Sequence, residues 1–247
     1  ARTLQISTKE KVNLPSLIQS LAKTNTQGYT FALNTGESEI NTLVGASPEL
    51  LIRKVGNTVI ANPIAGSRKR THNEKEDAQL AENLLKTAKD LQEHRVVVDM
   101  VRQALIPYLK TISVPESPSI VYTDTMIHLS TIITGEILDP KTSSLTLASA
   151  LHPTPAVCGE PRQKAFDFIN DIEPFNRDFF SGIIGYMEAN GDGEWIVTIR
   201  CAQVIENQLV LYAGAGIVES SVPVDECAET GAKFQTMLNA IGICIEN

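Results

Sequence analysis

The segment AGAGIVESSVPVDECAETGAK, residues 213–233, joins a glycine-containing loop to the start of a helix. Gly214 and Gly216 leave the loop backbone accessible, and Pro223 suits the first turn of the helix that follows. Three charged side chains project from one side of this helix because of their spacing: Glu226, Glu229 and Lys233. The segment therefore predicts either a site for a small anionic ligand with a hard metal ion, or a solvated helix face with an ion pair between its last two charged residues.

The composition limits the possible partners of the chain. Its 247 residues, 43% of them hydrophobic, can bury a substantial core and are enough for one large domain or two small ones. Because no interdomain linker is visible, we expect a single domain over residues 1–247. A net charge of −8 without a long basic run argues against nucleic acid as a partner. Because no apolar run is long enough to cross a bilayer and no signal peptide is visible, we expect a cytoplasmic protein without a membrane partner. The cysteines are scattered and indicate reduced thiols.

Apolar periodicity and turn residues predict a mixture of short strands and helices. Strands are expected at 2–8, 29–33, 42–44, 49–52, 58–61, 120–122 and 127–137. Helices are expected at 14–22, 145–151, 161–172 and from 223 onward, and a longer one from Asn73 to about Lys110 with a break near Asp90. Asn73 and Glu76 form a capping box for that longer helix. Residues 182–213 predict a three-stranded meander.

Two carboxylates stand beside apolar residues in these predicted elements. Glu49 begins an apolar run, where partial desolvation would raise its pKa and suit it to general acid catalysis. A strand-end glutamate facing water is the alternative. Glu93 lies on the core stripe of its predicted helix, one turn before Val97, and belongs either to the exposed end of the stripe or to a site.

Three further positions have two interpretations each. Gly66-Ser67 is expected in a loop with free amides beside three basic residues, which would be an anion site or a basic surface turn. His128 lies inside a predicted strand, where a hydrogen-bonded structural histidine is the commoner case. Arg200 is placed on a semi-polar strand face, from which it could reach solvent or hold a carboxylate with its bidentate fork.

Taken in order, these segments resemble the chorismate-utilising enzymes, from residue 1 to about residue 243. The motifs are GASPELLIR (45–53), PIAGSRKR (63–70), KDLQEH (89–94), IHLST (127–131), LHPTPAVCG (151–159), EPFNRDFFSGIIGY (173–186), GEWIVTIRCA (193–202), AGAGIV (213–218) and DECAETGAK (225–233). HPTPAVCG and GEWIVTIRCA are similar to the isochorismate synthase branch. The aminating branch typically has Thr-Gly-Ala-Pro-Lys where this chain has residues 158–162. Salicylate synthases, which also eliminate pyruvate, remain an alternative.

The resemblance implies an α/β (α+β) fold in which antiparallel sheets are layered face to face and helices pack outside. It also implies chorismate as the substrate and Mg²⁺ as the cofactor. Water would add at C2 of the ring while the C4 hydroxyl leaves, forming isochorismate. Family members are often monomers. HPTPAVCG is similar to the siderophore branch rather than to the menaquinone branch.

The same resemblance assigns roles to particular residues. Glu49 matches the general acid, and Glu93 and Glu229 match the carboxylates that bind Mg²⁺, with Glu226 as an outer or water-mediated partner. The positions that match substrate-binding groups are Gly66, Ser67, His128, Ala156, Arg200, Tyr212, Gly214, Gly216 and Lys233.

One departure concerns the catalytic base. In this family it is a lysine in a Lys-Val-Val-Leu-Ser/Ala-Arg type segment, and Ala1-Arg2 looks like the end of that segment. We therefore expect an N-terminally incomplete catalytic domain in which acid and metal site are present and the base lies upstream. If no such lysine exists, a non-catalytic chorismate-binding module is the remaining interpretation.

Overall fold

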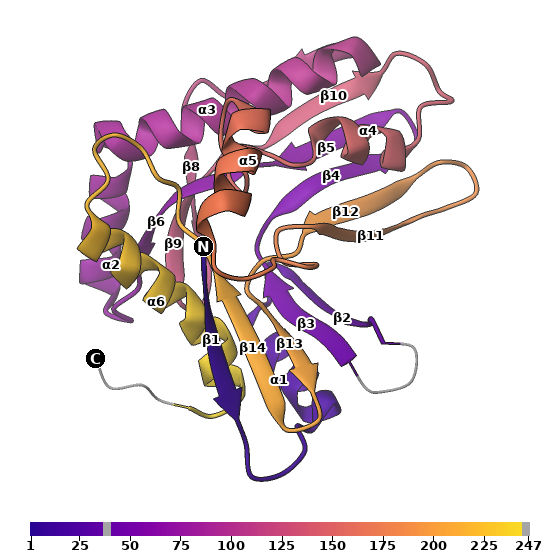
Figure 1. Ribbon diagram of the computed structural model, residues 1–247. Coiled ribbons are helices and arrows are strands. Elements are labelled where there is room, and N and C mark those ends of the chain that lie inside the picture. The colour runs from indigo at the N-terminus through magenta and orange to yellow at the C-terminus, as the bar shows by residue number, and fades with distance from the viewer. Residues whose placement is uncertain (37–40, 244–247) are drawn as a thin grey trace.

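The computed structural model describes residues 1–36 and 41–243, which form three antiparallel sheets. The five-stranded sheet has the order β1 (Arg2–Ser7), β14 (Gln208–Ala213), β13 (Cys201–Ile205), β3 (Asn41–Ser47) and β2 (Tyr29–Asn34). The six-stranded sheet has the order β11 (Ile183–Met187), β12 (Gly193–Val197), β4 (Leu50–Val55), β5 (Thr58–Asn62), β10 (Ile133–Ile137) and β7 (Leu109–Ser113). The smallest contains β6 (Ile64–Lys69), β9 (Met126–Ser130) and β8 (Ser119–Tyr122). Figure 1 shows the five-stranded sheet below the six-stranded one.

The helices are α1 (Leu14–Thr24), α2 (Glu74–Leu84), α3 (Ala88–Leu105), α4 (Ser144–Leu151), α5 (Arg162–Ile172) and α6 (Pro223–Ala240), with a short 3₁₀ turn at Ile106–Tyr108. The Asn73 side chain accepts hydrogen bonds from the backbone N–H groups of Lys75 and Glu76, so Asn73 is the N-cap of α2 as predicted. The Asn73 N–H donates to the Thr71 hydroxyl and not to Glu76, so the second bond of the predicted capping box is replaced. Pro223 occupies the first turn of α6, as predicted. No helix in residues 1–36 and 41–243 is both long and apolar enough to cross a bilayer.

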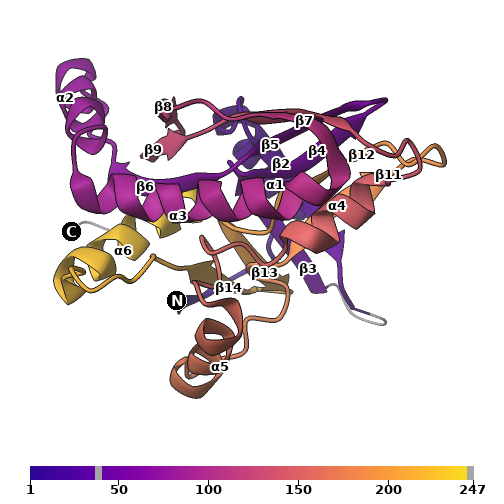
Figure 2. The ribbon, with the colours of Figure 1, turned by 90° about the horizontal axis from the view of Figure 1, so that it is seen from above.

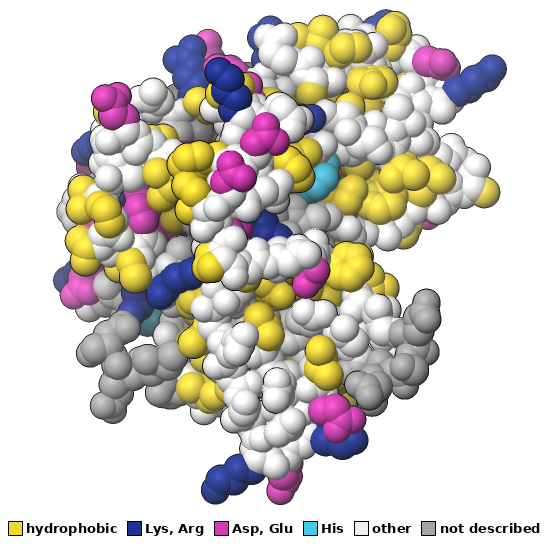
Figure 3. Space-filling model, in the orientation of Figure 1, with side chains coloured by type: hydrophobic (Ala, Val, Ile, Leu, Met, Phe, Trp, Pro, Cys, Tyr) yellow, Lys and Arg dark blue, Asp and Glu magenta, His cyan; other side chains and the backbone are white. Residues whose placement is uncertain are grey.

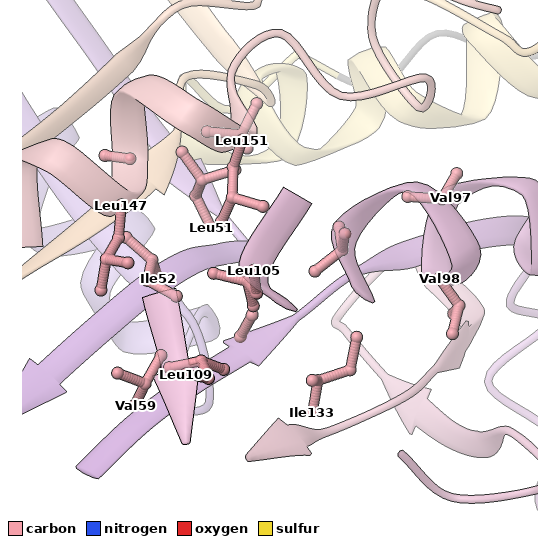
Figure 4. Close-up of a cluster of buried hydrophobic side chains, with 14 of the residues drawn as sticks. Leu51, Ile52, Val59, Val97, Val98, Leu105, Leu109, Ile133, Leu147 and Leu151 are labelled. Carbon is pink, nitrogen blue, oxygen red and sulfur yellow. The ribbon is translucent and has the colours of Figure 1, made fainter. Parts of the chain in front are cut away.

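Buried side chains fill the spaces between these layers. Phe31 and Cys201 of the five-stranded sheet share a cluster with Leu50 and Ile196 of the six-stranded sheet, so the two sheets pack face to face. The outer face of the five-stranded sheet packs against α1 and α6. The other face of the six-stranded sheet packs against α3 and α4, with residues such as Leu51, Leu105 and Leu147 (Figure 4). Seen from above, α3 extends along this layer from α2 to α4 (Figure 2). The predicted fold class is confirmed.

Three predicted elements are wrong at or near places where the chain passes from one sheet to another, and a fourth, a helix, breaks slightly earlier than expected. The meander expected at 182–213 is split because β12 ends at Val197 in one sheet and β13 begins at Cys201 in the next. The strand expected at 127–137 is split in the same way after Ser130. Residues 66–67 are not a loop but part of β6, where the pairing with β9 shifts register between Ala65 and Ser67. The helix expected from Asn73 breaks at residues 85–87, before Asp90.

Helix α5 differs from the other helices in burying none of its residues. Its aromatic side chains Phe166 and Phe168 are 50% and 65% exposed, and Ile172 is 59% exposed. In Figure 3 apolar and acidic side chains lie side by side in the area where Figure 1 places α5. The loop that follows this helix, by contrast, takes part in the pocket described next.

Candidate active site

One pocket gathers groups from the five-stranded and three-stranded sheets, from α3 and α6, and from the connections that enter and leave the six-stranded sheet. Twelve of the predicted site residues line it: Glu49, Gly66, Ser67, Glu93, His128, Ala156, Arg200, Tyr212, Gly214, Gly216, Glu229 and Lys233. They come from segments as distant in sequence as the β3–β4 connection, which contains Glu49, and α6. The fold therefore brings the predicted residues together, and the roles that the resemblance assigns to them remain predictions.

Glu49 stands just before β4 and is only 2% exposed. Its backbone N–H donates to the hydroxyl of Ser47 at the end of β3, and its carbonyl accepts from the N–H of Val197 at the end of β12. These two strand ends fix the position of Glu49. Burial raises the pKa of the Glu49 carboxyl to about 8, although the positive charges of Arg200 and Lys233 oppose the shift. The desolvated interpretation of Glu49 is therefore correct, and the carboxyl carries a proton at neutral pH.

Arg200 is 8% exposed and lies in the turn between β12 and β13, with a left-handed backbone φ of 52°. This conformation interrupts the strand alternation on which the predicted semi-polar face depended. The Arg200 Nη2 donates to Nε2 of His128 over 3.2 Å. Burial, and then the charges of Arg200 and Lys233, hold the pKa of His128 well below its usual value, so the imidazole is a neutral acceptor. Burial lowers the pKa of Arg200 to about 10, which leaves it positively charged at neutral pH.

The two carboxylates of the predicted metal site face the same pocket. Lys233 Nζ lies 2.5 Å from Glu229 Oε1 and donates to the Gly214 carbonyl over 2.8 Å. The predicted Glu229–Lys233 pair is thus confirmed, but it lies in the pocket and not on a solvated helix face. Glu93 lies against the loop after β14, since a Cβ added to Gly216 would come within 2.4 Å of Glu93 Oε1.

The charges of this cluster favour a bound cation. Burial, and then repulsion from Glu229, raises the pKa of Glu93 to about 7. Burial opposes ionisation of Glu229 too, but Lys233 and Ser67 bring its pKa below the usual value. No donor in the described part of the chain bonds the Glu93 carboxylate. Paired carboxylate oxygens are the ligands that Mg²⁺ prefers, so Glu93 and Glu229 fit this ion.

Glu226 is not brought to this cluster. Its carboxylate accepts a 2.7 Å hydrogen bond from Lys89 Nζ, and it does not line the pocket. Lys89 lies one turn before Glu93 on α3, and Glu226 lies one turn before Glu229 on α6. The two helices therefore place the Lys89–Glu226 pair beside the Glu93–Glu229 pair. Over residues 1–36 and 41–243, no group of three or more acidic, histidine or cysteine side chains is arranged to hold a metal.

Arg177 lines the pocket and was not among the predicted site residues. It donates to both oxygens of Glu173, at 2.7 and 2.6 Å, and to the Val157 carbonyl at 2.7 Å. Its guanidinium also lies over the ring of Phe180, which stacks on Tyr212 with centroids 5.2 Å apart. Arg177 thus joins three segments of the pocket wall. The only sequence signal was the spacing of four residues between Glu173 and Arg177 within EPFNRDFFSGIIGY.

Replacing Arg177 with methionine is expected to destabilise the protein by about 1–3 kcal/mol, because it leaves the partly buried Glu173 carboxylate without its bidentate partner and paired only with the Ala1 ammonium. Chemical unfolding followed by circular dichroism measures the change. Lys11→Met is the control, since Lys11 and Glu206 form an exposed ion pair worth at most about 1 kcal/mol. Equal effects of the two substitutions would contradict the bridging role of Arg177.

The stability of the metal-free protein is expected to fall between pH 5 and pH 8 because of Glu49. In this range the unfolded carboxyl is ionised while the folded one, with its pKa of about 8, keeps its proton. Glu49→Gln removes this term, so it should match the unmodified protein near pH 5 and exceed its unfolding free energy at pH 8 by about 2–4 kcal/mol. Unfolding curves at both pH values test this, and Glu116→Gln, at an exposed site, controls for net charge. If Glu49→Gln changed the unfolding free energy by the same amount at pH 5 and at pH 8, the Glu49 carboxyl would have an ordinary pKa in the folded protein, and the prediction would be wrong.

The chain is similar to known proteins over nearly its whole length. Residues 1–242 match the model of the chorismate binding enzymes. The chain is 51% identical to the isochorismate synthase DhbC of Bacillus subtilis over 98% of its length, and 48% identical to the vibriobactin-specific isochorismate synthase of Vibrio cholerae. These alignments cover 62% and 61% of the two relatives, so the chain spans less than two thirds of their length. A structure from Bacillus anthracis, described as a 2,3-dihydroxybenzoate-specific isochorismate synthase, superposes with a TM-score of 0.97 at 55% identity, covering 98% of this chain and 65% of that one.

Proposed function

Because the chain belongs to the family of chorismate binding enzymes, we propose that the protein containing it converts chorismate to isochorismate. The observation that carries this proposal is the content of one pocket: a buried, protonated Glu49, two cations in Arg200 and Lys233, and two facing carboxylates. A dianionic substrate needs the cations, and a departing hydroxyl needs the acid. The named isochorismate synthases with 51% and 48% identity support the same reaction.

In this reaction Glu49 gives its proton to the C4 hydroxyl of chorismate, which leaves as water. A second water adds at C2 and loses a proton to a base, so the substrate and product have the same composition. Arg200 holds a substrate carboxylate with its free N–H groups, while one N–H remains bonded to neutral His128. Lys233 is bonded to Glu229 and to the Gly214 carbonyl, which favours an electrostatic role for it. None of the residues that the structure describes is assigned the role of the base that activates water.

We also propose a Mg²⁺ requirement, with Glu93 and Glu229 as protein ligands. When bound, the ion would neutralise the substrate carboxylate next to the reacting ring and the negative charge that builds there. For cation binding, the chain itself contributes the carboxylates of Glu93 and Glu229, which it holds close together in the partly buried pocket. Glu229 stays ionised because Lys233 and Ser67 bond it, while Glu93 has no competing donor in the described part of the chain.

Two of the relatives carry names that specify a siderophore or its precursor, vibriobactin and 2,3-dihydroxybenzoate. The menaquinone-specific synthase MenF of Escherichia coli is more distant, at 28% identity. We therefore propose that the isochorismate made here supplies a dihydroxybenzoate-type siderophore rather than menaquinone.

Product analysis tests the reaction. The whole natural protein is incubated with chorismate, with and without Mg²⁺, and the products are separated by liquid chromatography. Isochorismate that depends on Mg²⁺ and forms without pyruvate supports the proposal. Salicylate with pyruvate would place the protein with the salicylate synthases and leave the site assignments in place. Bound chorismate without turnover would mean that the protein is a binding module.

A further inference from the structure

Ser67 contacts the site through Glu229. Its hydroxyl donates to Glu229 Oε1 over 2.8 Å, and the side chain of Lys233 lies 2.5 Å from the same oxygen. Ser67 itself is only 5% exposed. A carboxylate has about two acceptor positions on each oxygen, so these two donors occupy Oε1. In the described part of the chain, no donor reaches Oε2 of Glu229.

A β-bulge determines where the Ser67 hydroxyl lies. In the pairing of β6 with β9, Ala65 is opposite Leu129 and Ser67 is opposite His128, so Gly66 is the extra residue. Such a bulge re-aims the side chain that follows it. Gly66 has a φ of 77°, and a Cβ there would approach the Asp90 side chain to 3.3 Å. The backbone, and not a choice of rotamer alone, therefore directs Ser67 toward Glu229.

We propose that Ser67 is a positioning residue: its hydroxyl, together with Lys233, fixes Glu229 so that Oε2 is the oxygen presented to a divalent cation shared with Glu93. This inference rests on the proposed metal site. It differs from the substrate-binding role that the family resemblance implies for Ser67. The hydroxyl has a single proton, and that proton is already donated to Glu229. Only lone pairs remain to face a substrate carboxylate, and these repel it.

The test measures cation binding in the absence of substrate. Mn²⁺ replaces Mg²⁺ as the probe, and free Mn²⁺ is counted by electron paramagnetic resonance. Ser67→Ala is expected to weaken Mn²⁺ binding by about 10–100-fold, the usual effect of removing a group that orients a metal ligand. Ser67→Thr keeps a hydroxyl at the same place and should bind Mn²⁺ as the unmodified protein does.

The matched control is Ser130→Ala. Ser130 is also buried, at 1% exposed, and lies on β9 of the same sheet. Its hydroxyl donates to Asn62 Oδ1 over 2.6 Å, but Ser130 does not line the pocket. Its loss should leave Mn²⁺ binding unchanged. The effect of Ser67→Ala is then attributable to Glu229 and not to the loss of any buried hydroxyl.

The outcomes separate this inference from the proposed function. For Ser67→Ala at saturating Mg²⁺, the KM for chorismate should be unchanged. If Ser67→Ala raised the KM for chorismate without altering the Mn²⁺ affinity, Ser67 would be a substrate contact and the inference would be overturned. The inference would also be overturned if Ser67→Ala, Ser67→Thr and Ser130→Ala all bound Mn²⁺ with the affinity of the unmodified protein. If the unmodified protein binds no Mn²⁺, the proposed metal site fails and the positioning role fails with it.

Discussion

Replacing Glu49 with glutamine is expected to lower kcat for chorismate by about 10²–10⁴-fold, the range that a general acid contributes. Glutamine has nearly the same shape as the protonated carboxyl, which is the form that the buried site favours at neutral pH. The variant should therefore fold and bind chorismate, while the departing C4 hydroxyl receives no proton. Steady-state kinetics and equilibrium binding of chorismate separate the two effects.

The pH dependence gives the same prediction a second readout. Glu49 acts only while protonated, so kcat/KM should fall as the pH rises through about 8, the pKa of this carboxyl in the free protein. The residual activity of Glu49→Gln should lack this alkaline limb. Glu194→Gln is the control, because Glu194 pairs with Arg53 outside the pocket and its loss should leave kcat unchanged. A Glu49→Gln variant that turns over normally, or one that no longer binds chorismate, would contradict the role of general acid.

Prediction from the sequence succeeded where local pattern alone decides the structure. The cap at Asn73 and the proline at the start of α6 depend on a few neighbouring residues, and both are confirmed. The helix from Asn73 was harder, because the break at residues 85–87 contains no proline or glycine. Two of the errors near the sheet crossings have a local backbone cause. The left-handed Arg200 and the bulge at Gly66 change the direction of the following side chains, and the alternation of apolar and polar residues does not reveal such a change.

The candidate site shows the same division. The pattern left Glu93 undecided between a helix end and a site, because the deciding fact is the approach of Gly216 from a loop about 120 residues away. The resemblance to a family supplied the grouping of residues that the pattern could not. The resemblance gave no role to Arg177. This residue bonds Glu173, four residues before it, and also the carbonyl of Val157, which only folding brings close to it. The resemblance implied an outer or water-mediated role at the metal for Glu226, and it did not reveal that Glu226 pairs with Lys89 beside the pocket.

The strongest effect on cation binding is expected from Glu229→Gln. The amide removes one of the two negative charges of the pocket, and cation affinity should fall by at least about 100-fold, beyond the loss expected for an orienting group. Arg200 and Lys233 would keep their positive charges, so binding of the chorismate dianion without metal should be preserved. Mn²⁺ titration and chorismate binding, measured separately, check both parts.

Glu226→Gln is the matched comparison, since it removes a carboxylate one turn away on the same helix. In the structure Glu226 neutralises Lys89 and does not face the pocket, so its loss should weaken Mn²⁺ binding far less than Glu229→Gln. Because Lys89 would lose its partner, part of any effect should appear as lower stability of the contact between α3 and α6. Equal losses of Mn²⁺ affinity in the two variants would instead mean that Glu226 leaves Lys89 when the cation binds. That result would support the outer or water-mediated role at the metal that the family resemblance implies for Glu226.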